Sequence, residues 1–477
     1  MSAPEQQVCQ PDTAASVALR VTASALRWCC DEAWLPFATT DEVEPLTGVV
    51  GQDDAIEALR FGLEVSGPGQ NVFVRGLPGT GQFALVRALI EDIRPTCPLV
   101  DDRCYVHNFT RPDHPRLLSV PRAQGLILSR RIDELIAFVQ RDLAPFLTSD
   151  TLRTQRAALD DRLQEAIRRA GGPLEAELQA NNLALIPLQS GDTVQPTLLP
   201  VMDGQPITPE RFRELRTQGS IDDAMADRIY EQINVFRQRV ALLGEQIAQI
   251  QLEHRTHVQQ LYEQEARRIL QNQVRQISAA FPQATVTQFL SEIIEDVVTR
   301  HLATLAEDTT FTRLYRVNVV LPHGSDEPCP VVIESAPTMI NLLGLIEREW
   351  LTGGTVRSDH LMIRAGALLR ADGGFLILEA RDVLAEPGAW KVLVRALRSG
   401  RLEIMPAELA GAFAGPMLTP EPIDIKVKVI LLGDPGLYTL LDSQDPDFAQ
   451  LFKVLADFDT SIPRNQEGAY AYAGHLA

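Results

Sequence analysis

The sequence lacks the features that would assign the chain to a membrane, secreted or nucleic-acid-binding class. No apolar run is long enough to cross a bilayer, and the first twenty residues carry no secretory signal. We therefore expect a cytoplasmic protein without a membrane partner. Asp and Glu (63) outnumber Lys and Arg (44), which gives a formal net charge of −19. Because this charge would repel a phosphate backbone, nucleic acid is not an expected partner either.

Cysteine is scarce as well. The 477 residues include 6 cysteines, with no C-x-x-C pair and no histidine nearby at metal-ligand spacing. We expect reduced structural thiols and no metal cluster built on cysteine.

Composition and periodicity divide the chain into four segments. Residues 1–25 begin with small and polar side chains and are expected to be disordered. Residues 26–124 are expected to hold an N-terminal segment and the first half of an α/β core. Residues 125–305 are rich in Gln, Arg, Glu and Leu and predict a helical insertion. The core is expected to resume over 306–477. Length alone is consistent with two to four such units.

The insertion contains a heptad pattern that predicts coiled-coil or helical-hairpin packing, rather than a single amphipathic helix on a core. A turn-rich segment before it predicts a small β-hairpin element, with a turn at Asp203-Gly204. The heptad positions are Ile229, Ile233, Phe236, Val240, Leu243, Ile247 and Ile250.

The first half of the core contains a glycine-rich loop. A strand is expected at Val72 to Val74 and a helix from Gln82, which is the context of a phosphate-binding P-loop. The P-loop pattern ends in lysine followed by Ser or Thr, whereas this chain has the amide of Gln82 and the apolar ring of Phe83 at these two positions. A glycine turn without ligand and weak binding of ATP or ADP with Mg²⁺ both remain open. The eight positions are Gly76, Leu77, Pro78, Gly79, Thr80, Gly81, Gln82 and Phe83.

The second half supplies the other parts of a nucleotide site. A buried strand at Phe375 to Leu378 ends at Glu379, where a Walker B acid would order Mg²⁺, so Glu379 is the candidate metal ligand. Ala380 occupies the position of the water-activating acid. Asp382 is either its substitute or a solvated loop acid.

Two further positions resemble sensor and trans-acting residues. Asp434 follows the strand over 425–433, in the place of a sensor, although a turn-forming role is equally open. Lys453 lies where a cation could reach the nucleotide of a neighbouring subunit, and a solvated surface lysine is the alternative. A helix is also expected over 339–350.

With these features taken together, the chain resembles the AAA+ part of the Lon-related (Lon-like) proteases. The resemblance rests on segments from both halves of the core, among them GQDDAIEALRFGLEV, NVFVRGLPGTGQ, VVIESAPTMINLLGLIEREW, HLMIRAGALLRADGGFLILEARDVL and VILLGDPGLYTLLDSQDPDFAQLFKVLADFD. It implies an α/β fold, with an AAA+-type P-loop core in which helices flank a parallel sheet, interrupted by the long coiled-coil-like insertion. It also implies a homo-oligomeric ring, expected to be a hexamer, that handles unfolded polypeptides for a peptidase chamber.

Two departures from that family shape the functional prediction. Gln82, Phe83 and Ala380 predict poor ATP hydrolysis. The chain reaches Ala477 where a lid should begin, and no segment resembles the Ser-Lys peptidase domain; neither Ser335 nor Ser358 has the surroundings of a nucleophile. We therefore expect a regulatory and substrate-handling AAA+ portion with a degenerate nucleotide site and no catalytic residue, either truncated before its peptidase domain or working with a peptidase on another chain.

Two alternatives stay open. In the first, the chain is a working ATPase in which Arg75 or Arg87 replaces the missing lysine. In the second, it is a coiled-coil scaffold with a vestigial loop.

Overall fold

The computed structural model describes residues 21–22, 25–44, 50–76, 82–190, 193–202, 204–305, 307–325, 327–350, 356–404, 418–459 and 464–477. The chain forms two compact units. The first comprises 1–101, 323–358 and 362–477, and the second comprises 102–322 and 359–361. The segment 1–25, expected to be disordered, lies outside the described residues except at 21–22 and 25.

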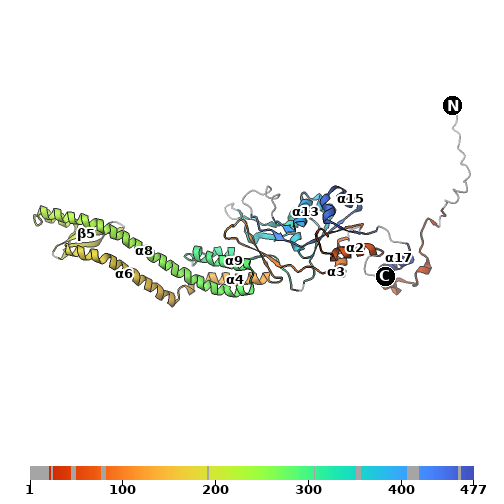
Figure 1. Ribbon diagram of the computed structural model, residues 1–477, viewed down its shortest axis with the longest axis horizontal. Helices are drawn as coiled ribbons and strands as arrows, with labels where there is room; N and C mark the ends of the chain where they lie inside the picture. The colour runs from red at the N-terminus through yellow and green to blue at the C-terminus, as the bar shows by residue number, and fades with distance from the viewer. Residues whose placement is uncertain are drawn as a thin grey trace, which may run out of the picture. The chain divides into compact units, whose positions relative to one another are not determined.

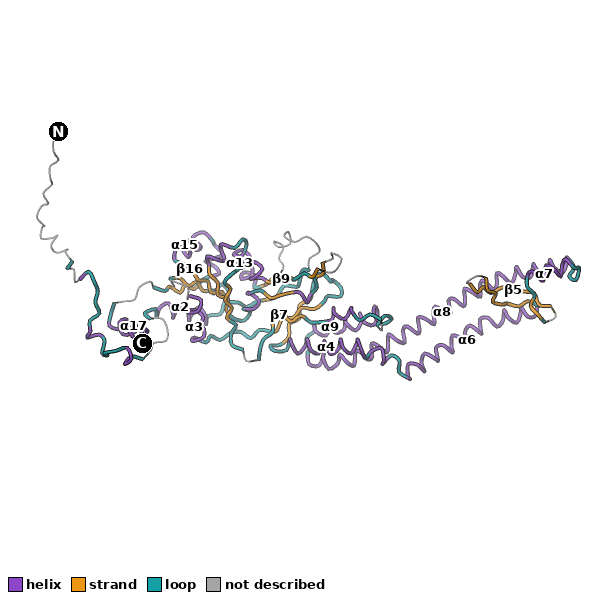
Figure 2. Tube along the Cα trace, turned by 180° about the vertical axis from the view of Figure 1, so that it is seen from behind, coloured by secondary structure: helices purple, strands orange, loops and turns teal. Residues whose placement is uncertain are grey.

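The first unit is built on a five-stranded parallel sheet (Figure 2). Its central strands are near-continuous apolar runs, as expected for strands covered on both faces. The register places Val72 beside Ile430 on one side and beside Val454 on the other. This sheet confirms the predicted parallel α/β core. The strand order is β17 (Val454–Asp457), β1 (Val72–Arg75), β16 (Lys428–Gly433), β13 (Phe375–Glu379) and β8 (Val331–Glu334).

Helices α2 (Asp53–Glu64) and α3 (Gln82–Ile93) pack on this sheet through one apolar cluster. From α3, this cluster takes Val86, Leu89 and Ile90, which recur at helical spacing. Among the residues that the structure describes, the other α-helices of the first unit are α10 (Met339–Leu343), α11 (Ala367–Arg370), α12 (Ala380–Ala385), α13 (Ala389–Ser399), α15 (Pro435–Gln444), α16 (Pro446–Leu451) and α17 (Gln466–Leu476).

Short elements complete the first unit. Two-residue and three-residue strands form antiparallel pairs, β10 with β11, β9 with β12 and β14 with β15. Their bounds are β9 (Gly344–Ile346), β10 (Glu349–Trp350), β11 (Val356–Arg357), β12 (Ile363–Ala365), β14 (Arg401–Leu402) and β15 (Ile423–Asp424), and the 3₁₀ turns are η2 (Glu32–Trp34) and η3 (Thr40–Glu42). A further 3₁₀ turn, η6 (His360–Met362), begins in the second unit and ends at the first residue of the returning first unit.

The helix expected over 339–350 was wrong beyond its first turn. Helix α10 ends at Leu343, because Gly344 has a φ of +101° and turns the chain into strand β9. A Cβ at Gly344 would lie 2.3 Å from the carbonyl oxygen of Arg364 on β12. Strand pairing therefore overrides the helical pattern of apolar residues that continues through Leu345 and Ile346.

The second unit contains a three-stranded antiparallel sheet and a helical body that share one core cluster. It is longer than the insertion expected over 125–305, because its three strands pair with one another and not with the five-stranded sheet. Its elements are β2 (Asp102–Val106), β3 (Arg116–Val120), α4 (Gly125–Arg141), α5 (Leu143–Phe146), α9 (Ala284–Asp296), the π-helical segment η4 (Val297–His301), the 3₁₀ turn η5 (Thr310–Tyr315) and β7 (Asn318–Leu321).

From this body a long helical hairpin extends, formed by α6 (Asp150–Ala180) and α8 (Asp223–Ala280), which lie side by side (Figures 1 and 2). Phe236 of the predicted heptad is buried against Leu174 and Leu178 of α6, with Ile233 packed beside it. The long helix and its packing thus confirm the coiled-coil-like insertion.

A small β element sits on this hairpin, as predicted. Its antiparallel strands are β4 (Leu183–Ser190), β5 (Thr193–Met202) and the two-residue β6 (Gln205–Pro206), followed by helix α7 (Pro209–Thr217). Gly204 has a φ of +76°, as a turn requires, whereas Asp203 lies outside the described residues.

One expectation about cysteine was wrong. Cys97 and Cys329 form a disulfide in the first unit, with Cα atoms 5.7 Å apart. The two residues are 232 positions apart in sequence, so spacing alone gave no signal of the bond. Cys97 precedes the 102–322 segment of the second unit and Cys329 follows it, so the bond joins the two segments of the first unit that flank this long segment.

Candidate functional site

The parallel strands bring three of the predicted site residues, Gly76, Glu379 and Asp434, to one edge of the sheet. Strand β1 leads into Gly76, β13 ends at Glu379, and β16 ends one residue before Asp434. Ligand sites in open α/β sheets lie at such carboxyl ends. Gly76 has a φ of +88°, and a Cβ there would lie 1.8 Å from the carbonyl oxygen of Phe458, so only glycine fits. The rest of the loop, Leu77, Pro78, Gly79, Thr80 and Gly81, lies outside the described residues, and its conformation stays a prediction.

Gln82 and Glu379 contact each other across this edge. The Nε2 atom of Gln82, the first residue of α3, donates a hydrogen bond of 3.1 Å to Oε2 of Glu379. Both side chains are partly buried. The amide therefore satisfies one oxygen of the only acid predicted to bind Mg²⁺, without adding a positive charge. Among the described residues, no group of three or more His, Cys, Asp or Glu side chains could hold a metal ion.

Phe83 occupies the position at which a P-loop hydroxyl would coordinate Mg²⁺. Its ring is partly buried and packs against the apolar cluster of the five-stranded sheet. A side chain in that role offers no oxygen to a metal ion. Gln82 and Phe83 thus both make contacts within the protein: Gln82 a polar contact with Glu379, and Phe83 an apolar contact with the core cluster.

Neither arginine proposed to replace the missing lysine is free of a carboxylate. Arg75, the last residue of β1, makes two hydrogen bonds to Asp457, at 2.5 Å from Nε and 2.6 Å from Nη2, and its guanidinium lies 5.2 Å from the ring centre of Tyr438. The hydrogen bond from Arg75 lowers the pKa of Asp457. Arg87 pairs with Glu91 one turn along α3, on the exposed surface of the helix.

Asp434 is positioned as a helix cap. Its Oδ1 accepts a hydrogen bond of 2.8 Å from the Leu437 backbone N–H at the start of α15, and its Oδ2 lies 3.2 Å from Nη2 of Arg381. The backbone hydrogen bond from Leu437 is the main cause of the lowered pKa of Asp434. The turn-forming alternative therefore describes its contacts, and a sensor role stays a prediction.

Asp382 and Lys453 are not brought to Glu379 by a described contact. Asp382 lies in the first turn of α12, where a carboxylate suits the helix dipole, and not in a strand-end loop. Lys453 precedes β17, at the amino end of the strand, and its Nζ donates to the carbonyl oxygen of Pro68 at 3.3 Å. Its action on a neighbouring subunit stays a prediction.

The half-buried Lys428 has a structural role that was not predicted. Its Nζ donates to the carbonyl oxygens of Gly62 (2.6 Å), Leu63 (2.9 Å) and Val65 (2.6 Å), at the carboxyl end of α2. Burial lowers the pKa of Lys428 to about 8, while the carbonyl oxygens and the helix dipole favour the ammonium form. The only signal was a lysine within an otherwise apolar strand. This cation anchors α2 to the sheet and does not face the P-loop edge.

The fold and the strand-end site define an AAA-like α/β core. Family models agree with this class: a LonB-like AAA domain matches residues 327–459, and a Lon-like LonC helical domain matches residues 102–135. The first match contains Glu379, Asp434 and Lys453, and the second begins where the second compact unit begins. These two matches support a Lon-related AAA+ protein.

Other comparisons add little. No curated protein matches the chain. One matching solved structure, NtrX from Brucella abortus, shares 20% sequence identity over 27% of this chain and 26% of its own, with a TM-score of 0.19. Within the described residues, a search for membrane-spanning helices finds none of sufficient length and apolarity.

Proposed function

We propose that this Lon-related AAA+ chain is the regulatory and substrate-handling part of a protease assembly, and that its nucleotide site is degenerate. The hydrogen bond between Gln82 and Glu379 is the observation that carries the proposal. It pairs the residue at the lysine position of the P-loop with the acid at the Walker B position. Two groups that would face phosphate and Mg²⁺ thus face each other.

Electrostatics supports weak or absent binding of ATP and ADP. A unit charge at about 4 Å from a phosphate contributes roughly 4 kcal/mol at an effective dielectric of about 20, and the neutral amide of Gln82 forgoes that attraction. Phe83 provides no ligand for Mg²⁺, which leaves Glu379 as the one predicted protein contact to the ion. Arg75 could reach a phosphate only by giving up Asp457.

The substrates we propose are unfolded polypeptides, handled by a homo-oligomeric ring of six chains. The long hairpin of α6 and α8 offers an extended surface for such contacts. Peptide hydrolysis would be performed by a peptidase domain outside these 477 residues. By itself, the chain is expected to leave casein-like substrates intact.

The test combines two titrations of the purified chain. Calorimetry with Mg²⁺-ATP and with Mg²⁺-ADP should give no measurable heat of binding, and labelled unfolded casein should bind to the same extent with and without ATP. A micromolar dissociation constant for Mg²⁺-ATP, with hydrolysis, would establish the working ATPase instead. Self-association without any casein binding would favour the scaffold.

A further inference from the structure

A groove of ≈ 670 Å³ lies in the second unit. It is bordered by α8, by the junction between α5 and α6, and by η4 with the turn that follows it. None of the site residues discussed above lines it.

The groove has an apolar floor. Leu147 and Leu305 are buried there, at 9% and 4% exposure, and the partly buried Val258, Tyr262 and Leu302 extend the same surface. Apolar area of this kind favours a ligand that removes it from water, at about 25 cal/mol for each Å² covered.

The rim of the groove is cationic. Arg156, Arg255 and Arg300 line it against a single acid, Glu263. Arg300 pairs with Asp296 at 3.0 Å, and Arg156 lies 3.8 Å from Asp160.

Arg255 is the rim arginine whose charge is available to a ligand. Within the described residues it forms no ion pair, and its side chain is exposed on α8. The chain as a whole is strongly acidic, with a formal net charge of −19. An arginine that no acid neutralises, next to the apolar floor, is therefore a local positive charge that complements a carboxylate on a ligand.

One wall of the groove has an unusual backbone that is firmly held. Residues 298–300, which line the groove, belong to the π-helical segment η4, and π-helical turns occur frequently at functional sites. Behind this wall, the buried Asp296 accepts a hydrogen bond of 2.7 Å from the Tyr315 hydroxyl. The ring of His301 stacks on Phe311 with 3.8 Å between ring centres. The wall is therefore preorganised, which lowers the entropy lost when a ligand binds.

We propose that this groove binds an extended peptide segment in which an apolar side chain lies next to a carboxylate. The apolar side chain covers the floor, and the carboxylate lies within reach of Arg255. The peptide belongs to an unfolded substrate chain, so this inference rests on the proposed function and adds to it a substrate preference and a place of contact.

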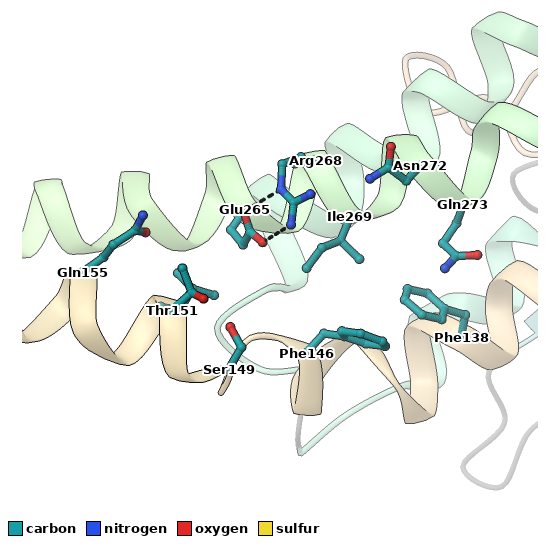
Figure 3. Close-up of a pocket in the computed structure, with 11 residues that line it drawn as sticks. Phe138, Phe146, Ser149, Thr151, Gln155, Glu265, Arg268, Ile269, Asn272 and Gln273 are labelled. Carbon is teal, nitrogen blue, oxygen red and sulfur yellow. Dashed lines mark hydrogen bonds and ion pairs between the residues drawn. The ribbon is translucent and has the colours of Figure 1, made fainter.

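A second groove, of ≈ 570 Å³, provides an internal comparison (Figure 3). Phe138, Phe146 and Ile269 form its apolar part, and its one arginine, Arg268, forms hydrogen bonds and an ion pair with Glu265. Because that charge is already neutralised, this groove should not select a carboxylate. Arg268 lies on the same helix as Arg255, so Arg268→Gln is a matched control.

The test measures fluorescence anisotropy of three labelled ten-residue peptides on the full chain. One peptide combines Leu and Phe with Glu, the second has Gln in place of Glu, and the third has Ser in place of the apolar residues. The parent should bind the first most tightly. Arg255→Gln should weaken that binding by about 3- to 5-fold, which corresponds to a partly exposed ion pair. Arg255→Glu should weaken it by about 10-fold or more, because a like charge is added. Binding of the Gln peptide to Arg255→Gln, and of the Glu peptide to Arg268→Gln, should change by less than about 2-fold.

Several results would overturn the inference. Equal affinity for the Glu and Gln peptides would remove the role of the carboxylate, and unchanged binding by Arg255→Glu would remove the role of this groove. Complete competition by inorganic phosphate would identify a small-anion site, and loss of self-association in Arg255→Glu with peptide binding intact would identify a contact between copies.

Casein binding separates the two proposals. If labelled casein still binds the parent while the peptides show no such preference, the inference fails and the proposed function stands. If casein does not bind the parent at all, the proposed function fails.

Discussion

Replacing Gln82 by lysine is the sharpest perturbation of the proposed nucleotide site. In the structure, the amide of Gln82 lies 3.1 Å from Glu379, at the first turn of α3. A lysine there would place an ammonium between Glu379 and the expected position of a bound phosphate. Without nucleotide, the new ion pair is partly exposed, so the free energy of unfolding should change by only about 0–1 kcal/mol.

With nucleotide present, the added charge should matter far more. One charge pair at about 4 Å is worth roughly 4 kcal/mol at an effective dielectric of about 20. Part of that gain is offset because the ammonium also pairs with Glu379 and loses part of its hydration. A net gain of about 2–3 kcal/mol remains, which lowers the dissociation constant of Mg²⁺-ATP by about 30- to 150-fold.

Calorimetric titration of parent, Gln82→Lys and Gln82→Met tests this reasoning. The methionine variant removes the hydrogen bond to Glu379 and adds no charge, so it should bind ATP no better than the parent. Circular dichroism and denaturant melts establish that each variant is folded. A folded lysine variant with the affinity of the parent would mean that the loop does not present phosphate to residue 82, and an equal gain in the methionine variant would mean that charge is not the cause.

Three further predictions concern stability and are checked by denaturant unfolding. Phe83→Thr should lower the free energy of unfolding by about 1–3 kcal/mol, because the ring leaves the core cluster, whereas Phe83→Leu should cost less; equal stability of all three proteins would contradict the packing. Tyr315→Phe should cost about 1–3 kcal/mol, because the buried Asp296 loses its hydroxyl donor, and the same substitution in an Asp296→Asn background should cost less. Cys97→Ser should cost about 2–5 kcal/mol, because the bond to Cys329 closes a loop of 232 residues, and no difference should remain once the parent is reduced.

Much of the core could be predicted because buried parallel strands leave a strong local pattern. The run from Phe375 to Leu378 follows two glycines and is entirely apolar, and it is strand β13 in the structure. The heptad around Phe236 is equally local, since seven-residue spacing is visible in any window of the chain. Both predictions succeeded where neighbouring residues in sequence also decide the packing.

The remaining features depend on contacts between distant residues, and no local pattern contains them. The disulfide joins positions 232 residues apart, and strands β2 and β7 pair across the whole helical insertion. The end of α10 at Gly344 is decided by the close approach of β12 to β9. Lys428 illustrates the same limit, because the carbonyl oxygens that hold its ammonium lie more than 360 residues earlier in the chain.

The contacts of Gln82 explain how a core can lose the phosphate-facing charge without losing its fold. Glu379 is partly buried at the end of a central strand, and an acceptor there that lost its partner would cost about 1–3 kcal/mol. An amide at position 82 can donate to that carboxylate, as a lysine could, but it cannot neutralise phosphate. The ring of Phe83 meanwhile fills space against the sheet. Under the proposed function, Gln82 and Phe83 therefore keep the internal contacts of the strand-end edge, while the attraction that a nucleotide requires is missing.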